Sequence, residues 1–371
     1  MKYFVLGKKD SPLLSLYLDK YFTKISQLLQ LLLKENIISV KVDLIVKENY
    51  RDFILHPDIS TLVLYLYDEC ILNKNQWLWD PDFYRNTLEK QCISFAKWDK
   101  ESLCLYDGVS ISNTDIKLSA YDHNPYNVFG TNRIDSNADM WWWNKSEQDW
   151  MRVCAKTFQA LKELDEWTYD ELNQVIKKIV PIGTSEWNHN SASYTTCVWT
   201  LYMWYTTDAV FPEFNILEAI IHESSHNKLL LIKQFHQLVC NNKEEKYYSP
   251  YRWDARHMDG VYIWIHAFVP VVFFLMKAYQ KGMFIGQDQN KWLLKIVLFY
   301  IKNKLCLSVI DKYAILDSLW IEILDEIREV MSMTDDIFKN MKISPEVVHE
   351  AKDIQMKHFQ DVNLKYPYLQ Y

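Results

Sequence analysis

Glycine and proline are scarce in this chain, which has 7 glycines and 10 prolines among 371 residues. That scarcity argues against collagen-like, linker-dominated and many-turned β architectures, and it favours helices. Cysteine cannot supply a disulfide framework, because the seven cysteines are widely spaced, odd in number and form no Cys-x-x-Cys pair. This usage fits a reducing compartment. The chain also shows no internal repeat with a period of 20 to 50 residues and no low-complexity tract.

Basic stretches are missing as well. The 41 Lys+Arg face 48 Asp+Glu, and the formal net charge of −7 is spread without long blocks. This balance gives no reason to expect nucleic acid as a partner.

Targeting and membrane segments are not predicted. The first ten residues hold too short an apolar run for a secretory signal, so we expect a cytoplasmic protein. The longest apolar stretch, 261–276, is shorter than the roughly 20 residues that span a bilayer, and it contains His266 and Pro270. We therefore expect a buried helix there and no membrane partner.

Apolar residues make up 49% of the chain and aromatic residues 15%, so wholesale disorder is excluded. The length allows one large core or two modest ones. The expected fold class is α+β and predominantly helical. We expect residues 1–135 to form an amino-terminal region whose role, with peptide recognition as one possibility, stays open, and residues 136–371 to form the domain that carries the functional motif described below. Trp141 to Trp143 are assigned to the core, because aromatic residues are more often core than binding platform.

Hydrophobic periodicity predicts the elements. Helices are expected at 13–33, 147–164, 169–179, 291–332 and 344–360, and β-like segments at 37–46, 61–67 and 197–205. A further helix begins at Asn215, where Glu218 completes a capping box, and runs to Val239.

Within that helix lies an HExxH pattern, His222 to His226. Four residues advance a helix by about 400°, so both imidazoles lie within about 40° of each other and can share one metal. The surrounding isoleucines and leucines place the motif in a buried helix, where Glu223 would be costly without a partner. A metal centre is therefore preferred over two ordinary hydrogen-bonded histidines, with Glu223 on its rim as the catalytic carboxylate.

Two imidazoles do not complete a metal site, so a third ligand must come from elsewhere. His266 is the preferred ligand, because it is the only strongly polar side chain in the longest apolar stretch. His257 and Asp259 are the alternative ligands. Instead of binding a metal, His266 could be a core histidine that forms a hydrogen bond with a backbone carbonyl. Glu244 and Glu245 are weaker candidates, since they belong to a charged loop.

Three linked motifs carry a family resemblance: His222 to Leu229, Ser249 to Arg256, and Gly260 to Val271 with its His-Ala-Phe run. Together they resemble the HExxH-type peptide-modifying proteins of ribosomal-peptide (RiPP) biosynthetic clusters over residues 180–272. The resemblance implies an iron(II)- and 2-oxoglutarate-dependent dioxygenase that β-hydroxylates a side chain of a ribosomally synthesised precursor peptide. The HExxH helix is then expected to pack on a second buried helix, with a small sheet beside the metal cleft.

Such an enzyme needs a cation to hold the distal carboxylate of 2-oxoglutarate, and an arginine fork suits that task. Arg252 and Arg256 are the candidates, and Lys228 is a third. The arginines could instead form salt bridges with nearby carboxylates such as Asp254, and Lys228 could be a surface lysine.

Two other functions remain open. In a zinc metallopeptidase, Glu223 would be the general base and Tyr262 or a nearby tyrosine the oxyanion donor. In a noncatalytic peptide-binding module, the aromatic residues would form the binding surface. A substrate peptide could pair with the 197–205 segment if that strand lies at a sheet edge. The sequence leaves open the oligomeric state and which residue of the peptide is modified.

Overall fold

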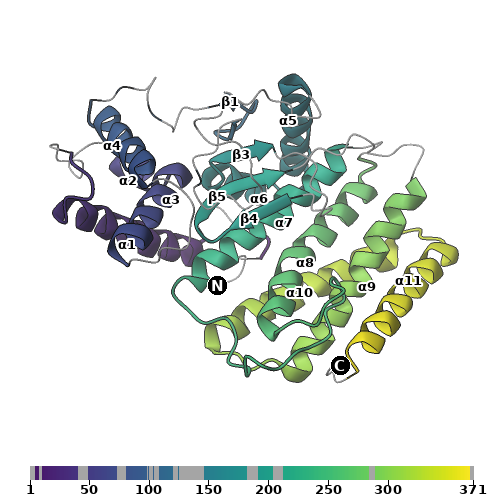
Figure 1. The fold of residues 1–371 in the computed structure, drawn as a ribbon. Helices are drawn as coiled ribbons and strands as arrows, with labels where there is room; N and C mark the ends of the chain where they lie inside the picture. Colours follow the sequence, from purple (N-terminus) through teal and green to yellow (C-terminus); the bar gives the residue numbers. More distant parts are fainter. Residues whose placement is uncertain are drawn as a thin grey trace. The chain divides into compact units, whose positions relative to one another are not determined.

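The computed structural model describes residues 5–7, 11–40, 49–72, 81–97, 99, 103, 108–119, 124, 146–181, 191–203, 212–283 and 289–367 (Figure 1). Helices predominate, and the strands form one small mixed sheet, which confirms the expected mostly helical α+β class.

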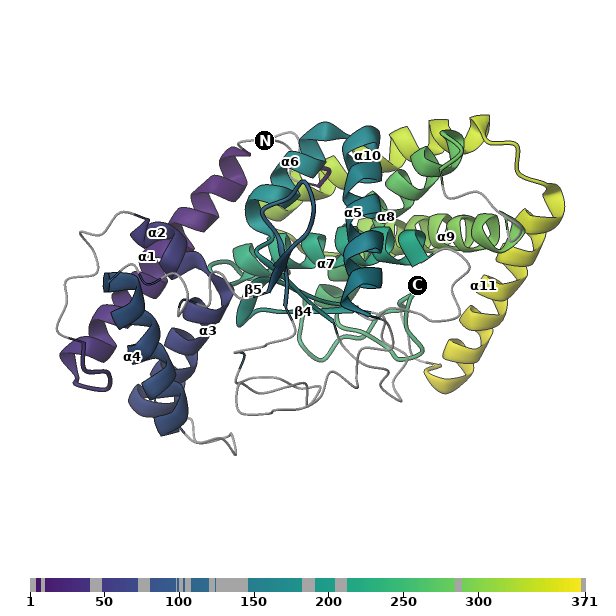
Figure 2. The same cartoon turned by 90° about the horizontal axis from the view of Figure 1, so that it is seen from above.

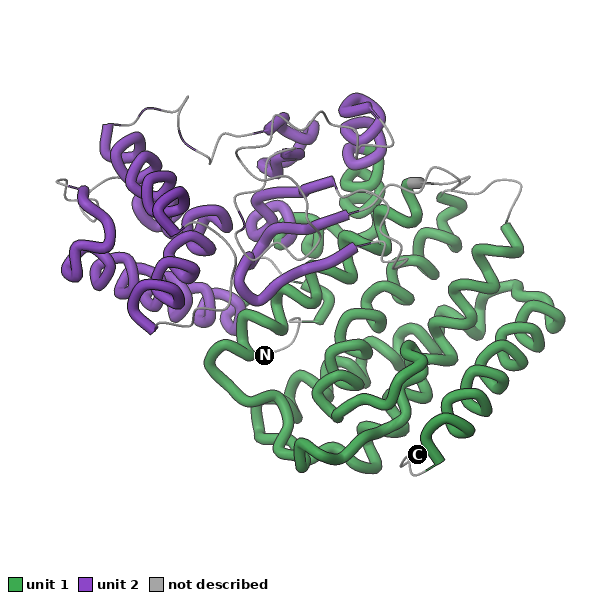
Figure 3. Tube along the Cα trace, in the orientation of Figure 1, with its two compact units in different colours: residues 1–11, 156–171, 208–371 green, residues 12–155, 172–207 purple. Residues whose placement is uncertain are grey.

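The chain divides into two compact units (Figure 3). Unit 1 comprises residues 1–11, 156–171 and 208–371, and unit 2 comprises residues 12–155 and 172–207. The expected boundary at residue 135, like Trp141 to Trp143, lies outside the described residues.

The sheet belongs to unit 2 and has the strand order β1-β2-β3-β5-β4. β3 is parallel to both of its neighbours, β2 and β5, whereas β1 pairs antiparallel with β2 and β4 pairs antiparallel with β5 at the two edges. The strands are β1 (Val109–Ser110), β2 (Lys117–Leu118), β3 (Lys178–Pro181), β4 (Ser191–Tyr194) and β5 (Cys197–Met203).

The strand expected from residue 197 is confirmed as β5, whose residues are all buried. Its suggested role at a sheet edge is wrong, because β5 pairs with β3 on one side and with β4 on the other. Both of its hydrogen-bonding edges are therefore used within the sheet, and a substrate peptide cannot add to it.

The amino-terminal part of unit 2 is helical: α1 (Pro12–Lys34), α2 (Tyr50–Leu55), α3 (Pro57–Leu66), the π-helical turn Tyr67–Ile71 and α4 (Pro81–Lys97). α1 confirms the helix expected at 13–33. The strand expected at 61–67 is wrong, because His56 caps a helix that begins with Pro57 at its first position. Most residues of α3 are buried, and this tertiary packing outweighs the β propensity of residues 61–67. Most of the strand expected at 37–46 lies outside the described residues.

A buried ion pair joins α3 to β3 within unit 2. Lys178 Nζ lies 2.9 and 3.0 Å from the two carboxylate oxygens of Asp58, and the side chains are 2% and 0% exposed. His56 Nδ1 lies 3.9 Å from the same carboxylate. Since both charges are out of water, each depends on the other for compensation.

We expect Asp58→Asn to lower the free energy of unfolding by about 3 to 5 kcal/mol, because it leaves the Lys178 ammonium buried without its counterion. Urea denaturation measures the change. Asp336→Asn is the matched control, since Asp336 and Lys339 form a pair whose side chains are about 70% exposed; it should cost less than about 1 kcal/mol. Equal costs for the two variants would contradict this assignment.

Unit 1 is a helical assembly with α8 at its centre. α8 packs against α7, α9 and α10, and α11 packs against α9 (Figures 1 and 2). The helices are α7 (Pro212–Lys233), α8 (Met258–Gln280), α9 (Gln289–Tyr313), α10 (Ser318–Asn340) and α11 (Pro345–Lys365). The chain passes between the two units within α5 (Glu147–Leu164) and α6 (Glu166–Val175).

Several helix boundaries differ from the expected ones. α5 has the expected bounds, but α6 ends at Val175 and the chain then forms β3, so the end of the helix expected at 169–179 is wrong. α7 begins at Pro212 instead of Asn215 and ends at Lys233 instead of Val239. The segment 291–332 forms two helices, because Asp317 caps a new one. The helix expected at 344–360 is confirmed as α11, which Ser344 caps.

α8 confirms the buried helix expected around 261–276. Over its 23 residues it is long and apolar enough to cross a membrane, but 83% of its most apolar window is buried inside the structure, as in core helices of soluble proteins. The helix continues through Pro270, and the Asn303 side-chain amide of α9 donates to the Phe268 carbonyl at 3.1 Å.

Candidate metal centre

The HExxH motif lies in the middle of α7, on the side of the helix that unit 1 buries. Ser224 and Ser225, which follow Glu223 and precede His226, are 1% and 3% exposed. Each serine hydroxyl donates to the backbone carbonyl four residues earlier, to Ile220 and Ile221 respectively. These bonds satisfy the hydroxyls inside the helix, so the motif can be buried without an unpaired serine.

The two imidazoles meet as the spacing predicts. The ring centroids of His222 and His226 are 4.3 Å apart, and the rings are inclined at 81°. Burial lowers the pKa of His226 to about 4. Burial, together with the charge of His226, lowers the pKa of His222 well below its ordinary value. Both rings are therefore neutral near pH 7, which is the form that binds metals.

The inner nitrogens of these rings lack the hydrogen bonds that burial normally requires. Nδ1 of His222 and Nδ1 of His226 are both buried, and neither forms a hydrogen bond with any residue in the described part of the chain. An unsatisfied buried polar atom costs about 1 to 3 kcal/mol. Both atoms therefore keep their lone pair or proton for a partner other than the described residues.

Aromatic rings of α8 fix the orientation of the imidazoles. The Phe268 ring lies 4.5 Å from the His222 ring, and the Trp264 ring lies 5.5 Å from His222 and 6.0 Å from His226. Tyr251 stacks nearly parallel on Phe268 at 4.1 Å and is nearly parallel to Trp264 at 5.8 Å. We call Tyr251, Trp264 and Phe268 the aromatic wall.

Glu223 is buried next to the histidine pair. Its side chain is 3% exposed, and Oε1 lies 4.0 Å from His222 Nε2. The backbone carbonyl of Glu223 accepts a hydrogen bond from the Asn227 side chain at 3.0 Å. The carboxylate therefore lies beside the His222 ring, at a distance where it can orient water or a ligand.

His266 is fully buried on α8. Burial lowers its pKa well below the ordinary value, and the charges of Lys228 and His226 lower it further. Among the described residues, however, no three His, Cys, Asp or Glu side chains are grouped to hold a metal, so His266 as third ligand stays a prediction.

The alternative third ligands have other contacts. His257 caps α8 and accepts from the Asp259 backbone N–H, and the Asp259 carboxylate pairs with Lys233 at 2.9 Å. Glu245 accepts a hydrogen bond from the Tyr247 hydroxyl at 2.5 Å. These contacts hold the side chains in capping, ion-pair and loop interactions.

Lys228 is not the surface lysine that the sequence allowed. It is 3% exposed and pairs with Glu171 of α6 at 2.9 Å. Gly7 packs against that carboxylate with φ +86°, and a Cβ at this position would lie 2.9 Å from Glu171 Oε1. Sequence reasoning missed Glu171, since it precedes Lys228 by 57 residues and no local pattern connects them.

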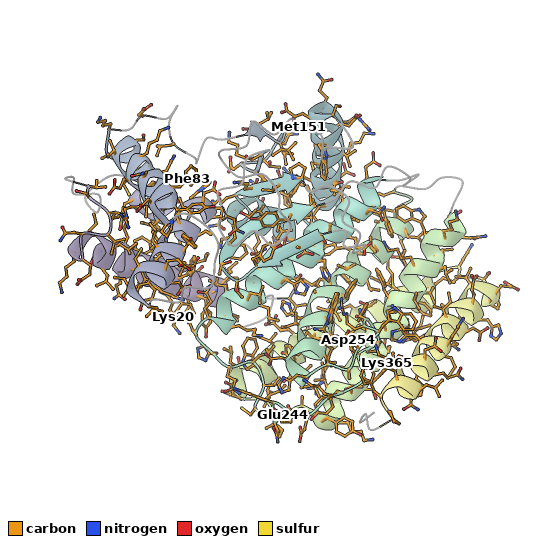
Figure 4. The ribbon with its side chains drawn as sticks, viewed as in Figure 1. Lys20, Phe83, Met151, Glu244, Asp254 and Lys365 are labelled. Atoms are coloured by element: carbon orange, nitrogen blue, oxygen red, sulfur yellow. The ribbon has the colours of Figure 1, made fainter. Side chains whose placement is uncertain are left out.

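Arg252 and Arg256 lie on one closed loop. Tyr247 and Arg256 form an isolated antiparallel bridge, and we call residues 247–256 the arginine loop. Asp254, labelled in Figure 4, bridges both arginines, with Arg252 Nε at 3.2 Å and Arg256 Nε at 2.9 Å. The predicted salt bridge to Asp254 is thus present. The Arg252 guanidinium also lies 5.9 Å from the Trp264 ring, so the aromatic wall touches both this cation and the histidines.

A divalent metal fits part of this donor set. The neutral, adjacent imidazoles of His222 and His226, with their unsatisfied buried nitrogens, suit a pair of metal ligands. Among the described residues, no third ligand is grouped with these two to complete a metal site.

Comparison with protein-family models gives no match, and comparison with curated proteins gives none either.

If His222 and His226 hold a metal, the wild-type protein will bind about one equivalent of Fe(II) or Co(II) under anaerobic conditions. His222→Ala and His226→Ala will each weaken binding by more than the ~10- to 100-fold that is typical for loss of a group that only supports a ligand. Equilibrium dialysis followed by metal analysis measures the affinity. His349→Ala on α11, whose side chain is 79% exposed, is the control and should bind normally. A metal content that is the same in all four proteins would contradict the assignment.

Proposed function

We propose that this protein is an iron(II)- and 2-oxoglutarate-dependent dioxygenase that β-hydroxylates a side chain of a ribosomally synthesised precursor peptide. The observation that carries the proposal is the pair of buried, neutral imidazoles one turn apart on α7, beside Glu223. His222 and His226 would hold the metal, with His266 as the expected third ligand. The bound iron and 2-oxoglutarate would supply the oxidising power that removes a hydrogen from carbon.

The arginine loop supports an oxygenase because it presents a cation to the same aromatic wall that contacts the histidines. Arg252 uses Nε for Asp254, which leaves its terminal nitrogens, the fork that binds carboxylates, for a ligand. Its side chain is 30% exposed, so a small diacid can approach it. Arg256 lies within ion-pair distance of Asp254, although its buried Nε forms no hydrogen bond with the described residues, and it is the second candidate. Lys228 is less suited, because Glu171 already compensates its charge.

The wall and the carboxylate have separate tasks in this proposal. Trp264 and Phe268 would exclude water from one side of the site and keep the imidazole rings in place. Glu223 would orient water or a ligand beside the metal, since its Oε1 is close to His222 without a direct hydrogen bond to it.

A zinc metallopeptidase remains the alternative, because the position of Glu223 also suits a general base. The structure gives it less support at the oxyanion donor. The Tyr262 hydroxyl is buried and donates to the Trp320 carbonyl at 2.8 Å, so it is engaged within the core. A noncatalytic peptide-binding module would be preferred only if the purified protein bound no divalent metal.

The test is anaerobic reconstitution with Fe(II), followed by addition of 2-oxoglutarate, oxygen and the precursor peptide. We expect succinate release that depends on iron and peptide, together with a peptide mass that increases by one oxygen atom. His222→Ala should reduce both to background. Peptide cleavage that requires zinc and does not depend on 2-oxoglutarate would overturn the proposal in favour of the peptidase.

Arg252→Ala should raise the KM for 2-oxoglutarate by about 10- to 100-fold, since a charge-assisted hydrogen bond contributes about 1.5 to 3 kcal/mol. Steady-state succinate formation measures this effect. Arg328→Ala on α10 is the control, because Arg328 is a half-exposed arginine that pairs with Asp311 and Asp325; its KM should not change. An unaltered KM in the Arg252 variant would remove Arg252 from the co-substrate site.

A further inference from the structure

The arginine loop is attached to α11, a helix that contributes nothing to the proposed metal site. Tyr248 of the loop and Val362 of α11 are the buried centre of an apolar cluster. Figure 4 labels Asp254 on the loop and Lys365 near the end of the same helix. The residues packed around this centre are Ala255, Phe359 and Tyr366.

Within this contact, His358 of α11 touches two residues of the loop. Its Nδ1 lies 2.9 Å from the Tyr248 hydroxyl, and its ring lies 4.3 Å from the Trp253 ring. His358 is 6% exposed, although Trp253, which covers it, is 61% exposed.

A chain of two hydrogen bonds reaches one nitrogen of His358. The Gln355 side-chain amide donates to the Tyr248 hydroxyl at 2.7 Å, so that hydroxyl can donate its own proton to His358 Nδ1. The Nδ1 atom is then the acceptor, which is the role it has in the neutral imidazole protonated on Nε2.

The surroundings favour that neutral form. Burial is the largest cause that lowers the pKa of His358 to about 4, and the Lys302 ammonium of α9 acts in the same direction. Asp361 of α11 and the backbone of Arg252 act in the opposite direction. The imidazole therefore keeps one acceptor and one donor at neutral pH, in the arrangement that the loop requires.

We propose that His358 is a positioning residue that holds the arginine loop so that the Arg252 guanidinium is preordered for the carboxylate of the co-substrate. This inference rests on the proposed function. The two neighbours of Arg252 have different supports, because Tyr251 stacks on Phe268 of α8 and Trp253 packs at an inclined angle against His358 of α11. His358 therefore holds the loop on both sides of Arg252, through the Tyr248 hydroxyl and through the Trp253 ring.

Loss of this contact should affect carboxylate binding more than the reaction itself. A loop residue that must be ordered on binding weakens affinity by about 5- to 30-fold. We expect His358→Phe, which keeps a ring beneath Trp253 but removes the hydrogen bond to Tyr248, to raise the KM for 2-oxoglutarate by that factor. At saturating 2-oxoglutarate, kcat should fall less than about twofold.

Tyr248→Phe tests the same hydrogen-bond chain from the loop side. It should raise the KM in the same direction, and the double variant with His358→Phe should be no worse than the more affected single variant, since both remove one linked contact. His358→Gln retains an amide donor and acceptor and should recover part of the affinity. His349→Phe, on the exposed side of the same helix, should leave the KM unchanged.

A second measurement does not depend on catalysis. Hydrogen–deuterium exchange of the whole protein should show faster exchange of the arginine-loop amides in His358→Phe than in the wild type or in His349→Phe, while α7 and α8 exchange at the wild-type rate. Unchanged loop exchange would overturn the positioning role whatever the activity of the protein.

The outcomes separate the two proposals. If Arg252→Ala raises the KM and His358→Phe does not, the role of His358 is wrong and the proposed function stands. If the wild type shows no 2-oxoglutarate-dependent turnover, the proposed function fails and the co-substrate role of His358 fails with it, while the exchange measurement still decides whether His358 holds the loop. A fall in kcat with an unchanged KM in His358→Phe would indicate only a loss of folded protein and would contradict the positioning role.

Discussion

The rest of the proposed site depends on two imidazoles that are buried side by side. The His222 and His226 rings are 4.3 Å apart and packed at steep angles against aromatic rings, burial lowers the pKa of both, and their Nδ1 atoms form no hydrogen bond with the described residues. A helix gains nothing in stability from this arrangement, because each unsatisfied nitrogen opposes folding. The arrangement is reasonable if a ligand such as a divalent metal satisfies those atoms, as at sites where function is obtained at the expense of stability.

The rest of unit 1 can be understood as support for that pair. α8 supplies Trp264 and Phe268, which contact the imidazoles, and Tyr251 of the arginine loop stacks on Phe268. α9 holds Tyr251, because the Tyr251 hydroxyl donates to the Asn303 side chain at 2.7 Å. α11 holds the other side of the loop through His358. The candidate cation Arg252 is thus placed by contacts from three helices.

The sequence predicted the parts of this arrangement that follow from local periodicity. The 3.6-residue repeat places both histidines of an HExxH motif on one face, and the apolar run at 261–276 predicted α8, so the pair and the helix it packs against could be derived directly. Boundaries failed where a cap outweighed the pattern, as at Pro57 and Asp317. Edge or centre position in a sheet depends on pairing between distant segments, so the sequence could not show that β5 is internal.

Contacts between distant residues were beyond the sequence for the same reason. Glu171 meets Lys228 across 57 residues, and His358 meets Tyr248 across 110. Neither pair has a local signal, because each depends on how whole helices pack. Lys228 shows the consequence: its position one turn beyond Ser224 was correct, but only the fold determines that it is buried and already paired.

The most direct test of the central claim is X-ray absorption spectroscopy of the Fe(II)-loaded protein, which reports the atoms bound to the metal. We expect a first shell of nitrogen and oxygen atoms at about 2.0 to 2.2 Å with the outer-shell scattering of at least two imidazoles, and loss of part of that scattering in His226→Ala. A metal environment without imidazole scattering, or one identical in the variant, would contradict the claim that these two histidines hold a metal.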